Sequence, residues 1–330
     1  MGEKTYMTNN RLLGNSFAKD FNKKYGIITY SGTLAIEIAL NSLNLRKQSK
    51  VLVLSEVCYS IVNTIIKLNL TPIIVNSKNQ LYLTDSDIDE VLKKENIDCI
   101  ILVHQYGILN NINFNKYMKM GIKIIEDVAQ AWSIGNDNYI IGKYSDIVVT
   151  SFGKTKPLSY GIGGGLFFND SSFFKEIDYC DNESREKEGV LLSYAYPICE
   201  SIKYDKLKTV ADSIVEEQRN NAKEYSNLLK KQEKIKFLDS DIYVGNVWHR
   251  FPIWVDDIIL YDKIVQLLKS SNLEYQLEHE IKLEDLPICT NCIKINNQCS
   301  SFYLILLRTR NINIKKQLKE LDYIIKCINK

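Results

Sequence analysis

The sequence predicts an α/β protein with a mostly parallel sheet flanked by helices and a smaller C-terminal α+β domain. Short apolar runs bounded by turn residues, at 51–54, 72–75 and 98–103, are typical of buried parallel strands. Amphipathic patterns over 258–272 and 313–329 indicate helices that cover one face of a second unit. The alternation of apolar runs with helical patterns therefore favours a layered α/β architecture.

The length of 330 residues is enough for one large domain and one smaller domain. A long amphipathic pattern over 206–229 predicts the helix that links them, so we place a large domain at 1–205 and a small C-terminal domain at 206–330. The alternating segment 247–255 predicts a strand of the small domain. Near the N-terminus, residues 17–29 are expected to form a short helix.

Composition excludes several classes of protein. Hydrophobic residues make up 45% and charged residues 25% of the chain, as in ordinary globular proteins. A net charge of +2 argues against a nucleic-acid or membrane-surface partner. No apolar run reaches the roughly 20 residues that span a bilayer, and the N-terminus has no signal-peptide core. We therefore expect a cytoplasmic protein without a membrane segment.

The eight cysteines are expected to be reduced thiols in such a compartment. Cys289 and Cys292 have a spacing that can bind zinc, with Cys299 and His279 nearby. One such pair with two irregular neighbours is a weak signal, so we favour incidental thiols and expect no metal.

Polar residues follow two of the predicted strands in the central part of the chain. The apolar run 122–125 ends on Glu126 and Asp127, and the run 147–150 closes on Ser151. Because strand residues alternate between faces, only one of the two acids can point to a given ligand. The carboxyl ends of parallel strands meet at one edge of a sheet, where open α/β sheets bind ligands.

A loop with Lys154 and Lys156 and a glycine-rich turn at 161–165 follow the second of these strands. An acid, a hydroxyl and a lysine at one edge suit pyridoxal phosphate (PLP). This cofactor needs a lysine for a Schiff base, an acid facing the pyridinium nitrogen and donors for its phosphate. Either lysine could also be an ordinary exposed side chain.

A second candidate phosphate site precedes the helical pattern at 34–43. Ser31, Gly32 and Thr33 stand at its start, where free backbone N–H groups and the positive end of the helix dipole favour an anion. The alternative is an N-capped helix without a ligand.

Four blocks in order, SGTLAIEIAL, VHQYG, IEDVAQAWS and SFGKTKPLSYGIGG, resemble the DegT/DnrJ/StrS family of PLP-dependent nucleotide-sugar aminotransferases. The resemblance implies the fold of type I PLP enzymes. It implies that Lys156 bonds the cofactor, that Asp127 lies under the ring nitrogen and that Gln130 lies near the ring hydroxyl. It also implies three phosphate ligands: Gly32, Thr33 and Ser151.

The same resemblance places an aromatic residue against the cofactor ring, near Cys58 and Tyr59. The family pattern aligns Cys58 with this position, but we favour Tyr59 because a flat ring can cover the pyridine face. The alternative is a buried tyrosine with a locally bonded hydroxyl. An Asn and an Arg that family members use across the dimer are absent around Ser193, and Arg185 or Tyr194 could replace them.

The implied reaction is transamination of a nucleotide-linked keto-sugar by a homodimer, with glutamate as the expected amino donor. The implied pathway is amino-sugar and surface polysaccharide biosynthesis or secondary-metabolite biosynthesis. One alternative keeps the cofactor but dehydrates or deoxygenates the sugar. Dehydratase relatives have histidine in place of the lysine, so Lys156 argues against a dehydratase. Another alternative is a degenerate, non-catalytic regulator, supported by the missing Asn and Arg and a short N-terminal segment.

Overall fold

The computed structural model describes nine segments of the chain: 12–76, 81–110, 112–132, 135–136, 139–174, 204–243, 245–277, 283–296 and 303–329. The candidate residues Arg185, Ser193, Tyr194, His279 and Cys299 lie outside these segments. No helix among the described residues combines the length and the apolar character needed to cross a bilayer.

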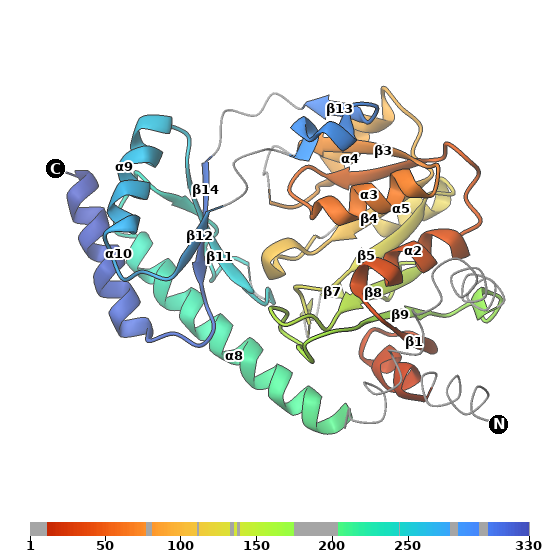
Figure 1. Cartoon of the computed structure of the whole chain (residues 1–330), viewed down its shortest axis with the longest axis horizontal. Coiled ribbons are helices and arrows are strands. Elements are labelled where there is room, and N and C mark those ends of the chain that lie inside the picture. Colours follow the sequence, from red (N-terminus) through yellow and green to blue (C-terminus); the bar gives the residue numbers. More distant parts are fainter. Residues whose placement is uncertain are drawn as a thin grey trace.

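One half of the protein is built on an eight-stranded sheet with the order β1-β9-β8-β5-β4-β2-β3-β13 (Figure 1). In that order the strands are β1 (Tyr25–Thr29), β9 (Gly164–Phe168), β8 (Ile147–Ser151), β5 (Lys123–Asp127), β4 (Cys99–Val103), β2 (Lys50–Leu54), β3 (Thr71–Asn76) and β13 (Ile293–Asn296). All neighbours from β8 to β13 are parallel, whereas β9 is antiparallel to both β8 and β1. The expected mostly parallel sheet is confirmed.

Helices pack on this sheet, and their sequences explain where they start. The sheet half contains a helix through 12–20, α2 (Gly32–Ser42), α3 (Tyr59–Lys67), α4 (Asp85–Leu92), α5 (Phe114–Lys119), the 3-10 turn η1 (Gln105–Gly107) and a small hairpin of β6 (Gly135–Asn136) and β7 (Tyr139–Ile140). Ser31 caps α2, and Thr84 caps α4 in a reciprocal capping box with Asp87. Every residue of β4 is buried, as expected for a strand inside a parallel sheet covered by helices.

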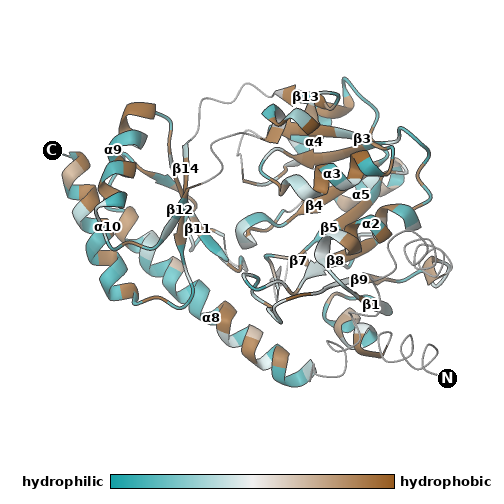
Figure 2. Cartoon of the chain, viewed as in Figure 1, coloured by the Kyte–Doolittle hydropathy of each residue, from teal (hydrophilic) through white to brown (hydrophobic). Residues whose placement is uncertain are grey.

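The other half is a four-stranded antiparallel sheet with the order β10-β11-β14-β12. Its elements are β10 (Lys236–Phe237), β11 (Arg250–Val255), β14 (Tyr303–Arg308), β12 (Tyr275–Leu277), α9 (Ile258–Lys269) and α10 (Ile314–Asn329). The long helix α8 (Tyr204–Leu229) runs beneath both halves in Figure 1. Figure 2 shows brown apolar strands in both sheets and teal polar faces on α8 and α10. These helices bury an apolar stripe and expose the opposite face.

The helix expected over 17–29 is only partly right. The helix passes through 12–20, but Tyr25–Thr29 forms β1 and pairs with β9. Two features of this segment favour a strand. Ile27 and Ile28 are β-branched and buried, and Gly26 touches another backbone, because a Cβ there would lie 2.2 Å from the Gly14 oxygen.

A segment from the C-terminal part of the chain returns to the large sheet. The 3-10 turns η2 (Leu283–Asp285) and η3 (Pro287–Cys289) lead into β13, which pairs with β3. Buried Cys289 and Ile295 belong to the same apolar core as the large sheet. The division at residues 1–205 and 206–330 stays a prediction, but β13 itself lies with the eight-stranded sheet.

Candidate active site

Three parallel strands deliver polar side chains to the same edge of the large sheet. Val103 of β4 pairs with Asp127 of β5, and Asp127 pairs with Val149 of β8. His104, Asp127 and Ser151 therefore stand at neighbouring strand ends. This is the edge that the sequence predicted as a ligand site.

Asp127 and Lys156 meet at this edge. Burial raises the pKa of Asp127, and the Ala129 amide, Lys156 and His104 oppose that effect. The Ala129 N–H donates to Asp127 Oδ1 at 2.9 Å and fixes the carboxylate. The two predicted site residues therefore interact electrostatically, and the carboxylate of Asp127 is buried.

Burial lowers the pKa of Lys156, opposed by the charges of Asp127 and Cys58, while Arg250 lowers it further. A lowered pKa increases the fraction of neutral amine, which is the form that attacks a carbonyl. Lys156 stands in a turn in which its N–H donates to the Gly153 oxygen at 3.0 Å. Lys154, the competing lysine, is exposed. Lys156 therefore has the environment expected for a reactive lysine.

The start of α2 packs directly on the end of β8. A Cβ at Gly32 would lie 2.9 Å from the Ser151 Cβ, so only glycine allows this approach. A Cβ at Gly164 would lie 2.5 Å from the Ser31 oxygen, which closes the other side. The structure thus brings Gly32, Thr33 and Ser151 together. Their part in holding a phosphate stays a prediction, but the first-turn amides and the Ser151 hydroxyl are suitable donors.

Gln130 lies one turn beyond Asp127 and is held by the chain. Its Oε1 accepts the Tyr106 N–H at 3.0 Å, and its Nε2 donates to Gln105 Oε1 at 3.2 Å. Tyr106 has a positive φ of 57° within η1, a backbone conformation that the bond from Gln130 helps to fix. The expected contact of Gln130 with the ring hydroxyl stays a prediction.

Cys58 and Tyr59 stand between β2 and α3. The alternative of a buried tyrosine is wrong, because the Tyr59 side chain is 59% exposed at the first position of α3. Cys58 is also exposed and lies close enough to Lys156 to act on its pKa. Which of the two covers the cofactor ring stays a prediction.

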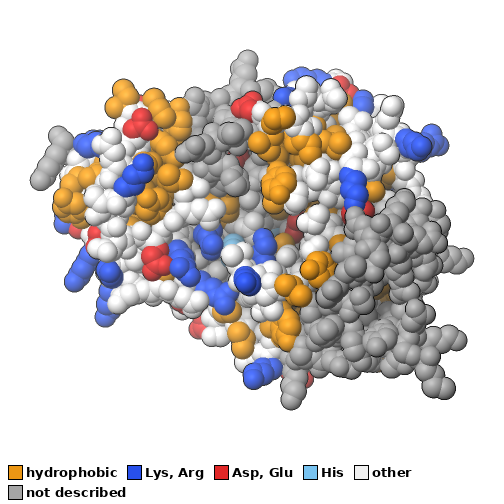
Figure 3. Space-filling view, viewed as in Figure 1, with side chains coloured by type: hydrophobic (Ala, Val, Ile, Leu, Met, Phe, Trp, Pro, Cys, Tyr) orange, Lys and Arg blue, Asp and Glu red, His pale blue; other side chains and the backbone are white. Residues whose placement is uncertain are grey.

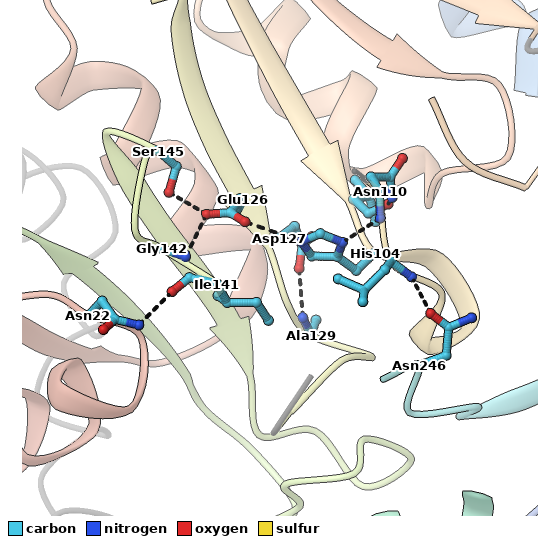
Figure 4. Close-up of polar contacts among 12 residues, drawn as sticks. Asn22, His104, Asn110, Glu126, Asp127, Ala129, Ile141, Gly142, Ser145 and Asn246 are labelled. Carbon is cyan, nitrogen blue, oxygen red and sulfur yellow. Dashed lines mark hydrogen bonds and ion pairs between the residues drawn. The ribbon is translucent and has the colours of Figure 1, made fainter. Parts of the chain in front are cut away.

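A buried polar network behind the site was not found from the sequence (Figure 4). His104 Nε2 lies 3.4 Å from Glu126 Oε1, and Glu126 Oε2 accepts the Gly142 N–H at 2.8 Å and the Ser145 hydroxyl at 2.5 Å. The expectation that only one acid of the pair faces the site agrees with this arrangement. Glu126 is bonded inside the protein, whereas Asp127 interacts with Lys156.

The second half of the protein contributes cationic side chains that face Lys156. Figure 3 shows Lys and Arg side chains around the hollowed centre between the two halves, with a histidine at its floor. Arg310 Nη1 donates to the Lys156 oxygen at 3.2 Å, and the charge of Arg250 acts on Lys156. His249, just before β11, is only 4% exposed and lies inside the protein. Arg310 was missed, and the only signal was its place beyond an apolar run in LLRTR.

Within the described segments, no group of three or more His, Cys, Asp or Glu side chains could hold a metal ion. Cys289 is buried at the end of η3, and the Cys292 N–H donates to its oxygen at 3.1 Å. Both are free thiols.

A mostly parallel sheet with a buried acid and a lysine at its carboxyl edge is the architecture of type I PLP enzymes. The chain belongs to the DegT/DnrJ/EryC1/StrS aminotransferase family, whose model matches residues 4–328. The resemblance drawn from the sequence is therefore confirmed. The expected cofactor, PLP, is confirmed at the level of this family.

Relatives and solved structures agree with this assignment. The chain is 29% identical over 178 residues to dTDP-3-amino-3,4,6-trideoxy-alpha-D-glucose transaminase of Micromonospora megalomicea subsp. nigra, a match that covers 51% of this chain and 48% of that protein. It thus spans about half the length of this curated relative.

The fold matches DesI, solved in the presence of its TDP-sugar product, with a TM-score of 0.79 at 16% identity over 98% of this chain and 85% of that one. It also matches Escherichia coli GDP-4-keto-6-deoxy-D-mannose-3-dehydratase with bound hydrated PLP, with a TM-score of 0.76 at 17% identity over 98% and 92% of the two chains. The fold expected from the sequence is therefore confirmed.

Proposed function

We propose that this protein is a PLP-dependent aminotransferase that moves an amino group to a nucleotide-linked keto-sugar. The observation that carries the proposal is the pair of Lys156 and buried Asp127 at the sheet edge. The packing of Gly32 against Ser151 supports it, because a side chain at position 32 would fill the space beside the expected phosphate.

PLP supplies an electron-accepting ring that stabilises the charge left when a C–H bond beside nitrogen is broken. In this proposal Asp127 stays ionised and keeps the ring nitrogen protonated. Lys156 Nζ holds the cofactor at rest, and after an amino substrate displaces it, it takes and returns the proton as a base. Ser151 and the amides of Gly32 and Thr33 orient the phosphate.

Glutamate as the amino donor, a homodimer and a cytoplasmic location belong to the same proposal. A nucleotide-linked sugar is supported by the transaminase relative, whose name specifies a dTDP-sugar.

Dehydration of the sugar is the second candidate reaction, since one of the solved proteins with a similar fold is a dehydratase. Lys156 favours transamination over this alternative, because a lysine can both bond the cofactor and return a proton to the product. A non-catalytic scaffold is the third reading, and the lowered pKa of Lys156 opposite Asp127 argues against it.

The test is the absorbance of purified protein with added PLP, for the wild type, Lys156→Ala and the matched variant Lys154→Ala. We expect a band near the edge of the visible range in the wild type and Lys154→Ala that glutamate bleaches. Lys156→Ala should lack the lysine-bound form. A band that persists in Lys156→Ala and disappears in Lys154→Ala would show that Lys154 is the reactive lysine. The absence of a band in all three proteins would overturn the enzyme proposal.

A further inference from the structure

We infer that Gln105 is a positioning residue that, together with the Tyr106 amide, turns the Gln130 side chain so that one Nε2 N–H faces the cofactor ring. The inference rests on the proposed function, since it takes PLP as the ligand at this edge of the sheet. Gln105 acts through Gln130 and not on the cofactor directly. It belongs to the turn η1, which the second half of the protein holds in place.

The orientation of the Gln130 amide follows from the groups around it. A backbone N–H can only donate, so the side-chain atom 3.0 Å from the Tyr106 nitrogen must be the amide oxygen, Oε1. The other end of the amide is then Nε2, which lies 3.2 Å from the Gln105 side chain. Because Nε2 only donates, the Gln105 atom at this position must be Oε1. The Tyr106 amide thus sets the direction of both glutamine side chains.

These two hydrogen bonds leave one N–H of Gln130 for a ligand. A glutamine amide has two N–H donors, and Gln105 accepts one of them. Among the residues that the structure describes, the Gln130 side chain bonds only Tyr106 and Gln105. Because the amide is planar, the two bonds also fix the direction of the second N–H. Gln130 is partly exposed three residues after Asp127, at the ligand edge of the sheet, whereas Gln105 is only 6% exposed.

The turn η1 is held by the second half of the protein before any ligand binds. The buried Tyr106 side chain lies in the apolar core of that half. The Val247 N–H donates to the Gly107 oxygen at 2.8 Å. A Cβ at Gly107 would lie 3.0 Å from the Gln130 backbone oxygen, so the turn also packs closely on the Gln130 backbone. Gln105 therefore offers an acceptor in a fixed place, which reduces the entropy that Gln130 loses on binding.

A directed N–H selects the group that the ligand must present to it. The partner must be an acceptor, and the ring oxygen of PLP is a strong acceptor when it is ionised. A hydrogen bond to the ionised form favours that form. With Asp127 at the ring nitrogen and Gln130 at the ring oxygen, two fixed groups set the angle of the ring at the sheet edge.

The test compares two ligands that bind without a bond to lysine: pyridoxamine phosphate and its analogue without the ring hydroxyl. Calorimetric titration of the full-length protein gives the ratio of their affinities. Gln105→Met keeps nearly the same length without the amide acceptor, and Gln105→Ala is a second variant without it. Gln105→Glu keeps an acceptor oxygen, and Gln130→Met removes the donor itself.

The matched control is Gln317→Met in the second half of the protein. Gln317 is 2% exposed and also uses both ends of its amide, because Oε1 accepts the Glu274 N–H at 2.6 Å and Nε2 donates to the Asn272 oxygen at 3.3 Å. Thermal melting of each variant checks that it folds. A purely structural effect of a substitution would weaken both ligands equally and leave the ratio unchanged.

We expect the wild type to bind pyridoxamine phosphate about tenfold or more tighter than the analogue, since the analogue loses a hydrogen bond to a charged oxygen. Gln130→Met should lose nearly all of this preference. Gln105→Met and Gln105→Ala should each lower the ratio by about threefold or more, whereas Gln105→Glu and Gln317→Met should stay within about twofold of the wild type.

The inference is overturned if the Gln105 variants without the acceptor keep the wild-type ratio, or if Gln317→Met lowers the ratio as much as they do. If the wild type binds both ligands equally well, the inference fails while binding of the cofactor stands. If the wild type binds neither ligand, the proposed function fails together with the inference.

Discussion

His104 and Glu126 form a buried pair, with His104 Nε2 at 3.4 Å from Glu126 Oε1 and both side chains at most 1% exposed. The Asn110 N–H donates to His104 Nδ1 at 3.1 Å, so the proton of a neutral imidazole sits on Nε2 and points to Glu126. The backbone N–H of His104 also donates to the Asp127 carbonyl at 3.0 Å. These contacts therefore connect the end of β4 to the end of β5, which carries Asp127.

Glu126→Gln should lower the free energy of unfolding by about 1–3 kcal/mol. The buried carboxylate accepts hydrogen bonds at both oxygens, whereas the amide of glutamine has an NH2 donor in place of one of them. Equilibrium unfolding in urea measures this free energy. The control is Glu95→Gln, whose carboxylate pairs with Lys50 at a partly exposed site and should change stability by less than about 1 kcal/mol. Equal losses in the two variants would contradict the structural importance of the buried pair.

Lys23 makes stability depend on pH in the alkaline range. Burial lowers its pKa to about 8, opposed by the charges of Glu126 and Asp146. Between that pH and the ordinary lysine pKa of 10.5, the unfolded chain holds a proton that the folded chain has lost, so the unfolding free energy contributed by Lys23 rises with pH. Below about 8 both states are protonated and the slope vanishes.

The stability of wild type minus that of Lys23→Met should therefore increase between pH 8 and 10 by up to about 1.4 kcal/mol per pH unit. Urea unfolding at several pH values measures it. Lys24→Met, at the exposed neighbouring position, should give a flat difference. A flat difference for Lys23→Met as well would show that this lysine keeps its proton in the folded state.

Gly107 joins the two halves of the protein at close range. It has a φ of +78°, and a Cβ there would lie 2.9 Å from both the His249 and Trp248 nitrogens. Gly121 has nearly the same φ, +81°, with nothing within 4 Å of its Cβ position. Gly121→Ala should therefore cost only the backbone strain, about 1–2 kcal/mol.

Gly107→Ala should lower the free energy of unfolding by about 1–3 kcal/mol more than Gly121→Ala, because the new methyl group pushes neighbouring backbone atoms apart. It should also weaken the bond in which the Val247 N–H donates to the Gly107 oxygen at 2.8 Å. Thermal and urea unfolding of the two variants give the comparison. Similar losses of stability in the two variants would mean that the two halves can move apart at Gly107 at no energetic cost.

Asp127→Asn should leave the fold and PLP binding in place but slow the glutamate half-reaction by about a hundredfold or more. Asparagine keeps an oxygen for the Ala129 N–H but has no charge to hold a proton on the ring nitrogen. Stopped-flow absorbance after mixing with glutamate measures the rate, and the PLP band before mixing is the internal control. A normal rate would remove Asp127 from the reaction.

The sequence by itself determined the layered α/β fold, most strands and long helices, and the family. Apolar runs and 3.6-residue periodicity record burial, which depends mainly on local side chains. The predicted helix over 206–229 and the strands ending at Asp127 and Ser151 agree with α8, β5 and β8. The motifs that place Lys156 and Asp127 are local as well, so they could be recognised without coordinates.

Only the tertiary structure decided which distant segments meet. The pairing of β13 with β3 and of β1 with β9 joins segments that lie far apart in the sequence, and no local pattern encodes a pairing partner. The same holds for Arg310, which reaches Lys156 from the last strand of the chain. Its charge marks an ordinary surface residue in the sequence, and it becomes part of the site because the second half of the protein folds over the carboxyl edge of the first.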